Sequence, residues 1–156
     1  MKMDNNKALI EQFYVALKNK EIIELQSHYA ENAVFNDPIF SNLDGKQVRA
    51  MWEMLIKSGK DMRIEFYNVQ GNATGGTAQW DAYYTFSATG KKVINRITAH
   101  FTIENGKIVK HTDSFSFNNW ARQALGIPGL LFGWSSFIKD KISARAKKNL
   151  EAFMST

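Results

Sequence analysis

The sequence predicts an α+β fold in which helices lie on a curved antiparallel sheet and a further helix extends the C-terminus. Three observations support this prediction. Apolar residues recur at helical spacing over the first third of the chain, they alternate with polar residues from about residue 62 to 117, and a last amphipathic stretch follows. With 156 residues the chain is long enough for one domain with one core.

The spacing of large apolar residues predicts two helices at the N-terminus. The first buries a stripe at positions i, i+3, i+4 and i+7, formed by Ile10, Phe13, Tyr14 and Leu17. The second is shorter, and its apolar positions are Ile22, Leu25 and Tyr29. A short strand over 33–35 then ends at Asn36-Asp37-Pro38, which is a turn signal.

Asp44 predicts the start of a third helix, because with Gln47 three residues later it forms a capping-box pattern. The apolar residues that this helix buries are Val48, Met51, Trp52 and Leu55. Near the C-terminus, Asn118 or Asn119 is expected to cap a helix through Leu125, which Gly126 ends.

After Ile127-Pro128-Gly129 a last helix is expected to begin near Ser135. We therefore divide the chain into a main domain over 1–126 and a C-terminal helical extension of the same domain over 127–156.

Four strands are predicted between these helices. The first contains Met62, Ile64 and Phe66, and the longer ones run at about 77–87, 92–103 and 107–117. The dipeptide Asn105-Gly106 is a strong signal for a type I′ hairpin, and a two-residue loop fixes which residues face each other. Counting outward gives three pairs on one face, namely His100 with His111, Thr98 with Asp113, and Arg96 with Phe115.

This face is the apolar side of the last strand, so Asp113 and His111 are expected to point inward. A carboxylate and two imidazoles among apolar neighbours must be paired, hydrated or neutralised. The sequence therefore predicts a polar pocket whose lining includes Arg96, Thr98, His100, His111 and Phe115. The alternative is structural: Asp113 bonds backbone or hydroxyl groups, and Asp37 serves only its turn.

The partner strand shows the opposite pattern, because its apolar residues fall on the other face of the sheet. These residues are Ile97, Ala99, Phe101 and Ile103. We expect a second copy of the chain to cover them, which makes the protein a homodimer through the outer sheet face. On the strand at 77–87 the more apolar face includes Trp80, which favours Trp80 inside and Asp81 outside. A tight loop at Thr89-Gly90 would instead bring Asp81 beside Thr98 and Asp113.

Several classes of site are not expected. The absence of cysteine excludes disulfides, thiolate zinc sites and a cysteine nucleophile. No metal-ligand spacing such as His-Glu-x-x-His occurs, and we expect neither a metal nor a cofactor. Because no signal peptide or apolar spanning segment is seen, a cytoplasmic location is expected.

The net charge of +5 comes mainly from the last predicted helix, whose basic residues are Lys139, Lys141, Arg145, Lys147 and Lys148. Beside them runs an apolar stripe formed by Ile138, Ile142, Ala146, Leu150 and Phe153. Helices at membrane surfaces have this pattern, but packing on the protein's own domain is the commoner role, so no membrane contact is expected. Nucleic-acid binding is not expected either, because no basic motif interleaved with exposed aromatic residues is present.

Three motifs occur in a characteristic order: Tyr29-Ala30-Glu31-Asn32-Ala33 before Asn36-Asp37-Pro38, then Asp44-Gly45-Lys46, then Asn105-Gly106-Lys107-Ile108-Val109 before His111-Thr112-Asp113-Ser114-Phe115. Over most of its length the chain thus resembles the nuclear transport factor 2-like superfamily. This superfamily includes ketosteroid isomerases, SnoaL-type polyketide cyclases and limonene epoxide hydrolases. The resemblance implies a cone-shaped fold with helices on the concave sheet face, frequent dimers and a small-molecule pocket.

The resemblance also implies candidate catalytic residues. Asp37 matches the general base of ketosteroid isomerases, whose two oxyanion donors fall on Phe13, with Tyr14 one residue further, and on Thr98. Asp113 resembles an aspartate of the water-activating group in limonene epoxide hydrolases. The arginine and second aspartate of that group fall on Trp80 and Ala82.

Tyr14, Trp52 and Trp80 complete the predicted ligand-binding residues. Two functions are compatible with this site. One is an acid–base isomerase, cyclase or hydrolase for a mainly apolar molecule, with Asp113 or Asp37 as base. The other is a non-catalytic ligand-binding or dimerisation module.

A later stretch resembles an uncharacterised bacterial branch of the same superfamily. It comprises Trp120-Ala121-Arg122-Gln123-Ala124-Leu125-Gly126, then Pro128-Gly129-Leu130-Leu131 and Gly133-Trp134. No activity is implied by this likeness.

Overall fold

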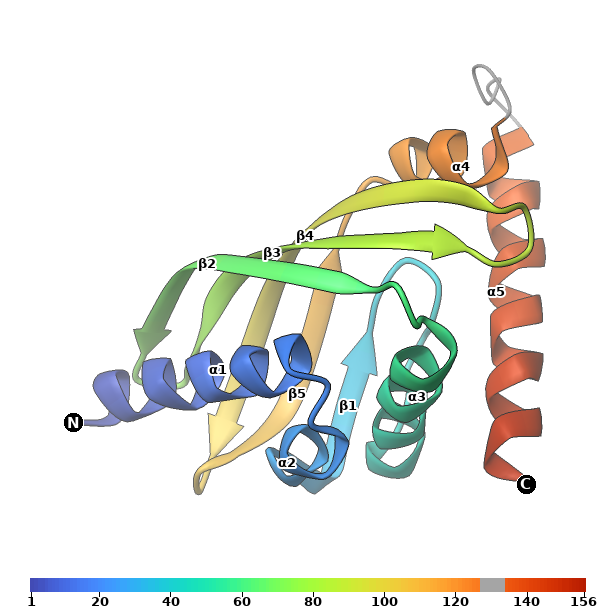
Figure 1. The fold of residues 1–156 in the computed structure, drawn as a ribbon. Helices are drawn as coiled ribbons and strands as arrows, with labels where there is room; N and C mark the ends of the chain where they lie inside the picture. Colours follow the sequence, from blue (N-terminus) through green and yellow to red (C-terminus); the bar gives the residue numbers. More distant parts are fainter. Residues whose placement is uncertain (127–133) are drawn as a thin grey trace.

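Three N-terminal helices cover the concave face of a curved five-stranded sheet in the computed structural model, which describes residues 1–126 and 134–156 (Figure 1). The predicted α+β class is confirmed. The helices are α1 (Lys2–Lys18), α2 (Ile22–Ser27), α3 (Gly45–Ser58), α4 (Phe117–Leu125) and α5 (Trp134–Met154). The strands are β1 (Tyr29–Asn36), β2 (Arg63–Asn72), β3 (Gly75–Phe86), β4 (Lys91–Glu104) and β5 (Lys107–Ser114).

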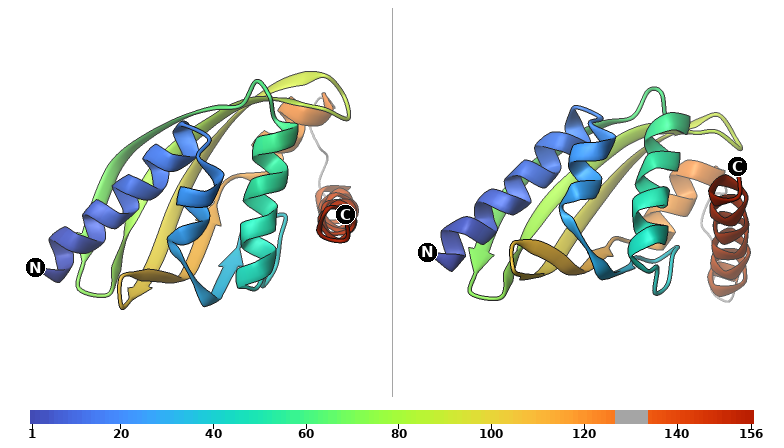
Figure 2. Two further views of the ribbon diagram at one scale, coloured as in Figure 1. Left: turned by 60° about the horizontal axis from the view of Figure 1, so that its bottom comes forward. Right: turned by 90° about the horizontal axis from the view of Figure 1, so that it is seen from below.

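The strands follow the order β1-β5-β4-β3-β2, and α1, α2 and α3 lie on one side of the sheet (Figure 2). Strands β2 to β5 pair antiparallel with their neighbours, as predicted, whereas β1 pairs parallel with β5. The sheet is therefore mostly antiparallel, with one parallel edge strand.

Helix α1 packs closely on the sheet through the predicted stripe. Ile10, Phe13, Tyr14 and Leu17 are all buried. The backbones approach so closely that a Cβ atom at Gly71 in β2 would collide with the carbonyl oxygen of Met3. Glycine therefore allows α1 to lie directly on the sheet.

Helix α2 is shorter than the sequence suggested, because Tyr29 belongs to β1 and not to the helix. The backbone at this point pairs with β5: Tyr29 lies beside Ile108, and the Ile108 amide donates to the His28 carbonyl at 2.8 Å. The parallel pairing thus takes over where the helix stops, and the Tyr29 side chain enters the core.

Two helix starts show how side chains cap backbone amides. Asp44 and Gln47 form the predicted capping box of α3, with each side chain accepting from the other residue's backbone N–H at 2.9 Å. For α4 the prediction was wrong by two or three residues: Ser116, not Asn118 or Asn119, is the N-cap, and it accepts from the Asn119 amide at 3.2 Å. Gly126 ends α4 with φ at +66°, as expected for a glycine C-cap.

The β4–β5 hairpin has the predicted loop but a different register. Asn105 and Gly106 have φ of +51° and +73°, which fits a type I′ turn. Ile103 pairs with Ile108, but the next pair is Thr102 with Lys110, so Val109 is an extra residue. This β-bulge shifts every later pair by one position.

The shift corrects the predicted facing pairs. His111 lies opposite Phe101 and Asp113 lies opposite Ala99, so neither faces His100 or Thr98. The extra residue turns the apolar side of β4 to the same face as His111 and Asp113. As a result the residues once expected to need a partner molecule are buried in the core, namely Ile97, Ala99, Phe101 and Ile103.

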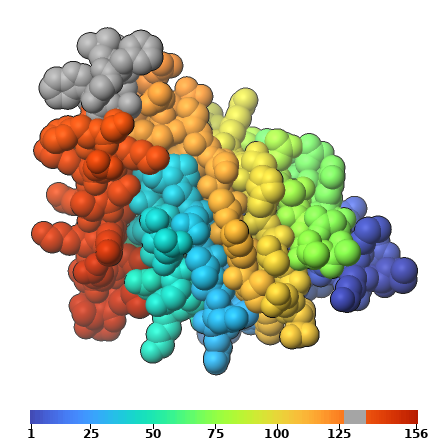
Figure 3. Space-filling model, turned by 180° about the vertical axis from the view of Figure 1, so that it is seen from behind, coloured from blue at the N-terminus to red at the C-terminus, as the bar shows by residue number. Residues whose placement is uncertain are grey.

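The outer face of the sheet accordingly carries the polar residues of β4. Arg96 and His100 are exposed and Thr98 is half-buried. Viewed from behind, strands β3 to β5 run along this face without a covering helix (Figure 3). The apolar residues that suggested a dimer are absent from it, so the register removes that argument for one.

The N-terminal half of β4 extends beyond β5, whose pairing starts at Thr98 and Ser114. Helix α4 occupies the edge that this leaves. Gln123 accepts from the Ile94 amide at 2.8 Å and donates to the Ile94 carbonyl at 3.0 Å. One side chain therefore replaces a neighbouring strand at this residue.

Helix α5 packs on the domain with its predicted apolar stripe. Leu150 is 2% exposed and joins the main core with Ala146, while Ile138 and Ile142 pack on a second cluster. This second cluster, called the α4 cluster, consists of Val93, Phe117, Trp120, Ala121 and Ala124. All five basic residues of α5 are exposed.

The predicted turn at Ile127-Pro128-Gly129 and the motif residues 128–131 and 133 lie outside the described residues. Within the described part of the chain, no helix combines the length and apolar character needed to span a bilayer.

Candidate functional site

A continuous hydrogen-bonded network crosses the interior of the cone from α3 to β5. Trp52 Nε1 donates to the Tyr29 hydroxyl at 2.8 Å, and this hydroxyl lies 2.8 Å from His111 Nδ1. His111 Nε2 in turn lies 2.8 Å from Asp113 Oδ1. Because Trp52 occupies the Tyr29 oxygen as donor, the Tyr29 hydrogen is free for Nδ1, and Nε2–H donates to the carboxylate.

The network is enclosed by aromatic rings. His111 is 0% exposed and Asp113 is 4% exposed. The rings of Phe101, Phe35 and Phe13 lie 4.3, 4.9 and 5.7 Å from the His111 ring, centre to centre. In such surroundings an unpaired polar group is costly, so the partners of His111 fix its position and tautomer.

Asp37 is a second carboxylate near this network, and it is half-buried. It follows β1, and its Oδ1 accepts from the amides of Ile39 at 2.7 Å and Phe40 at 2.6 Å. Burial raises the pKa of Asp37 from 3.8 to about 6, against the lowering effect of these two hydrogen bonds. The Asp113 charge raises this pKa further and His111 lowers it, so Asp37 is electrostatically coupled to the network.

The raised pKa of Asp37 predicts a pH-dependent stability. Between pH 4 and about 6 the folded protein keeps a proton that the unfolded chain releases, so the free energy of unfolding falls as pH rises. In Asp37→Asn this contribution is absent. From pH 4.5 to 7.5 we expect the free energy of unfolding of the native protein to fall by about 2 kcal/mol more than that of the variant.

Urea unfolding at the two pH values measures this difference. Asp81→Asn is the matched control, since Asp81 lies on the outer face and accepts from the exposed Tyr67 hydroxyl at 3.0 Å. Equal pH dependence of native protein and Asp37→Asn would contradict the raised pKa.

Two buried polar atoms beside the network have no hydrogen-bond partner among the described residues. They are the hydroxyl of Tyr14 and Nε1 of Trp80. The side chains are neighbours, with ring centres 5.8 Å apart. Burial raises the pKa of Tyr14 well above its usual value, and the Asp113 charge adds to this, so the hydroxyl lies within the field of that carboxylate.

Such unpartnered donors cost stability and call for an explanation. Two N–H or O–H donors without a protein partner are suited to bind an oxygen atom of another molecule.

A further polar pair lies toward the α4 cluster. Trp120 Nε1 donates to the Tyr84 hydroxyl at 2.6 Å. Burial raises the pKa of Tyr84 and the Asp37 charge raises it further, so Tyr84 lies within the field of Asp37.

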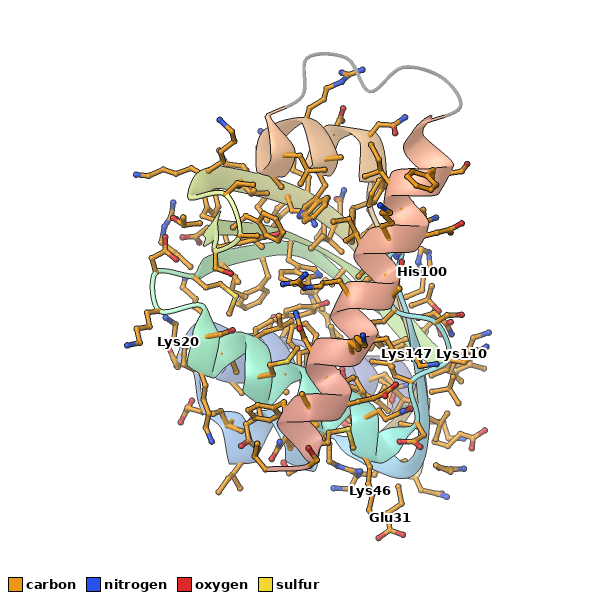
Figure 4. The ribbon with its side chains drawn as sticks, turned by 90° about the vertical axis from the view of Figure 1, so that its right-hand side faces the viewer. Lys20, Glu31, Lys46, His100, Lys110 and Lys147 are labelled. Carbon is orange, nitrogen blue, oxygen red and sulfur yellow. The ribbon has the colours of Figure 1, made fainter. Side chains whose placement is uncertain are left out.

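The structure brings together most of the predicted site residues and excludes others. Residues that face the interior are Tyr14, Asp37, Trp52, Trp80, His111 and Asp113, and half-buried Phe115 packs against both the main core and the α4 cluster. Three predicted ligand-binding residues lie instead on the outer face, namely Arg96, Thr98 and His100. His100 and Lys110 are on the same outer side of the molecule (Figure 4).

Tyr29 was missed as a site residue. It had been assigned to a helix because its spacing from Leu25 is helical, and its strand lacks a regular alternation that would have shown otherwise. Of the two directions that the sequence left open for Asp81, the structure has the outward one, since β3 buries Trp80 and Ala82.

Other parts of the described surface carry two grooves that are separate from this site. One, of about 690 Å³, lies between α2 and α3, and the other, of about 440 Å³, lies between β4 and α4 and is lined by Arg96 and Arg122. The described residues contain no group of three or more histidines and carboxylates arranged to hold a metal ion.

The curved sheet, the helices on its concave face and the polar residues enclosed between them define a nuclear transport factor 2-like domain. The SnoaL-like domain model matches residues 10–111, which is more than half of the chain. The protein therefore belongs to the SnoaL-like family. A comparison with curated protein sequences finds no match.

Solved structures with the same fold include several proteins of low sequence identity. A limonene epoxide hydrolase-like epoxide hydrolase of M. tuberculosis has a TM-score of 0.67 and 13% identity, with 81% of this chain and 93% of that chain covered. AclR, a putative hydroxylase from Streptomyces galilaeus, has a TM-score of 0.68 and 16% identity, with coverages of 81% and 99%. IdmH, a putative polyketide cyclase from Streptomyces antibioticus, has a TM-score of 0.65 and 17% identity, with 78% of this chain and 99% of that chain covered.

Proposed function

We propose that the protein binds a small, mainly apolar, oxygen-bearing molecule inside the cone and catalyses an acid–base reaction on it. The observation that carries this proposal is the buried Asp113 carboxylate, which is held through one oxygen by His111 and whose charge acts on the unpartnered Tyr14 hydroxyl. Isomerisation, cyclisation and hydrolysis all need this combination of a base and a donor for oxygen. The similarity to polyketide cyclases and an epoxide hydrolase supports the same range of reactions.

In this proposal each group has a distinct role. Asp113 takes a proton from a carbon atom or from water, and the bond from His111 fixes its orientation. Tyr14 and Trp80 donate hydrogen bonds to the oxygen on which negative charge develops. Asp37, with a pKa of about 6, is partly protonated near neutral pH and can return the proton.

The test uses proton exchange at carbon. The protein is incubated in D₂O with a panel of polycyclic phenolic ketones and cyclic enones, and deuterium incorporation is followed by NMR. We expect at least one compound to exchange, and Asp113→Asn to slow the exchange by about 10²-fold or more. Terpenoid epoxides, assayed for diol formation, complete the panel.

Asp81→Asn is the matched control, because it makes the same chemical change on the outer face. It should leave the exchange rate unchanged. Tyr14→Phe should weaken binding or slow exchange while the fold stays at least as stable, since the lost hydroxyl has no partner among the described residues. Exchange that survives in Asp113→Asn would refute the assigned base.

A non-catalytic ligand-binding module is the alternative, and the structural bonds of both carboxylates favour it. Asp37 caps its own turn and Asp113 is held by His111. Retention of a bound panel compound without any exchange or hydrolysis would support this alternative.

The cytoplasmic location and the homodimer through the outer sheet face stay predictions. Light scattering coupled to size-exclusion chromatography measures the mass in solution and decides between one copy and two. A dimer through this face would bury polar residues such as Arg96 and His100.

A further inference from the structure

Helix α5 closes one end of the cone. In the side view of Figure 4 it runs across this end of the molecule, in front of α3 and the sheet. It touches two apolar clusters at once: Ile138 and Ile142 pack on the α4 cluster, whereas Ala146 and Leu150 pack on the main core. The helix therefore bridges the main core and the α4 cluster.

Asp37 lies near the residues that join the two clusters contacted by α5, because the Ile39 amide donates to its carboxylate and Ile39 packs on both clusters. Ile39, Tyr84 and Phe115 pack against both clusters, and the Asp37 charge acts on Tyr84. The inner part of the site is closed, with His111 0% and Asp113 4% exposed. A molecule can therefore reach Asp113 after some surrounding element has moved.

Among the long helices, α5 has the weakest anchoring. Helix α1 buries six residues over its 17 positions, and α3 buries five over 14. In α5, by contrast, Leu150 is the one buried side chain over the described positions 136–154, and the other inward residues are half-buried. Elements with few buried apolar contacts open locally at lower free energy than the whole domain.

The solved structures compared above lack part of what this chain has. They are covered over 93–99% of their length, while 78–81% of this chain is covered. About a fifth of the chain thus has no counterpart in them. The family match ends at residue 111, well before α5 begins at Trp134.

We propose that α5 is a displaceable cap of the cone, which separates from α3 and from the α4 cluster to admit a small molecule to the Asp37 end of the site. The entry of a small molecule rests on the proposed function. The opening of the helix does not, because it follows from the packing of α5 alone.

The test measures exposure of the interior with a single thiol, since the natural chain has no cysteine. Ala82→Cys places the thiol between Trp80 and Tyr84 on the inner face of β3, where Ala82 is 4% exposed. Ala16→Cys places a control thiol on the buried face of α1, at a position that is 1% exposed. The rate of reaction with an aromatic disulfide reagent is measured in native buffer for both.

Leu150→Ala should raise the reaction rate of the Ala82→Cys thiol by about tenfold or more, because it removes the main anchor of α5. The rate of the Ala16→Cys thiol should change less than about twofold. Glu151→Ala, which alters an exposed neighbour on the same helix, should change neither rate. If Leu150→Ala does not fold, Ile142→Ala replaces it. This variant weakens the contact of α5 with the α4 cluster and should likewise accelerate the Ala82→Cys thiol more than the Ala16→Cys thiol.

Equal acceleration of both thiols would mean that α5 opens only when the whole domain unfolds, and an unchanged Ala82→Cys rate would mean that α5 does not control access. Either result overturns the proposal. The thiol test uses no ligand, so its result is independent of the ligand panel. If α5 opens selectively but the protein binds no panel compound, the cap proposal stands and the proposed function is refuted. If the protein turns over a panel compound but α5 does not open selectively, the proposed function stands and the cap proposal is refuted.

Discussion

Replacing His111 by leucine is expected to lower the free energy of unfolding by about 3–5 kcal/mol. The substitution leaves the Asp113 carboxylate in an apolar interior without its 2.8 Å partner, and the Tyr29 hydroxyl loses one of its two hydrogen bonds. The cost comes chiefly from these stranded polar groups and less from the lost contacts of the ring. Urea unfolding at neutral pH measures it.

His100→Leu is the control for this substitution, because the same side chain lies one strand away on the outer face. We expect it to change the stability by less than about 0.5 kcal/mol. The double variant His111→Leu with Asp113→Leu should recover much of the loss, since no buried carboxylate is then left. Similar effects of His111→Leu and His100→Leu would contradict the register that the bulge at Val109 creates.

Replacing Phe13 by alanine is expected to lower the free energy of unfolding by about 3–5 kcal/mol, which is the second large effect. The ring is 0% exposed and lies at the centre of the aromatic interior. Ring centres within 5.1–6.4 Å of it are those of Tyr14, His28, Tyr29, Trp52, Phe101 and His111. The alanine leaves a cavity that these rings cannot fill without moving off the sheet and the network.

Two variants of the same helix calibrate this effect by urea unfolding. Val15→Ala, at a position that is 45% exposed, should change stability by less than about 0.5 kcal/mol. Phe13→Leu keeps most of the volume and should cost clearly less than Phe13→Ala. A cost below about 1 kcal/mol for Phe13→Ala would mean that the interior repacks freely and that the cone is not close-packed there.

Much of the fold could be predicted because local sequence and tertiary structure agree. The stripe that includes Phe13 and Tyr14, the capping box at Asp44 and the turn at Asn105-Gly106 each specify one element through residues close in sequence. The parallel pairing of β1 with β5 had no such local signal. It joins Tyr29 to Ile108, which are far apart in the chain.

The direction of the side chains was predicted correctly on one strand and incorrectly on its neighbour. In β5 the alternation of polar and apolar residues was sufficient to place His111 and Asp113 inside. The assignment of Thr98 and His100 depended on an unbroken register from the loop. A bulge at Val109 is invisible in the sequence, because valine is an ordinary strand residue and nothing local marks the extra position.

The apolar residues of β4 indicate which face of that strand points inward, and the predicted register did not use this. Ile97, Ala99, Phe101 and Ile103 form a regular inward face by their own alternation. Two apolar faces on paired strands that appear to point in opposite directions can be reconciled by one inserted residue, without a second molecule. Tyr14 and Trp80 were also placed inside, although their unpartnered donors could be recognised only once the packing was known.

The two hydrogen bonds between Gln123 and the Ile94 backbone have a consequence for colloidal behaviour. An open strand edge offers its amides and carbonyls to any other chain and can start edge-to-edge aggregation. Here a helix side chain uses both groups of an exposed residue near the end of the strand. The amide of Gln123 thus protects the protein from assembling into extended sheets with other molecules.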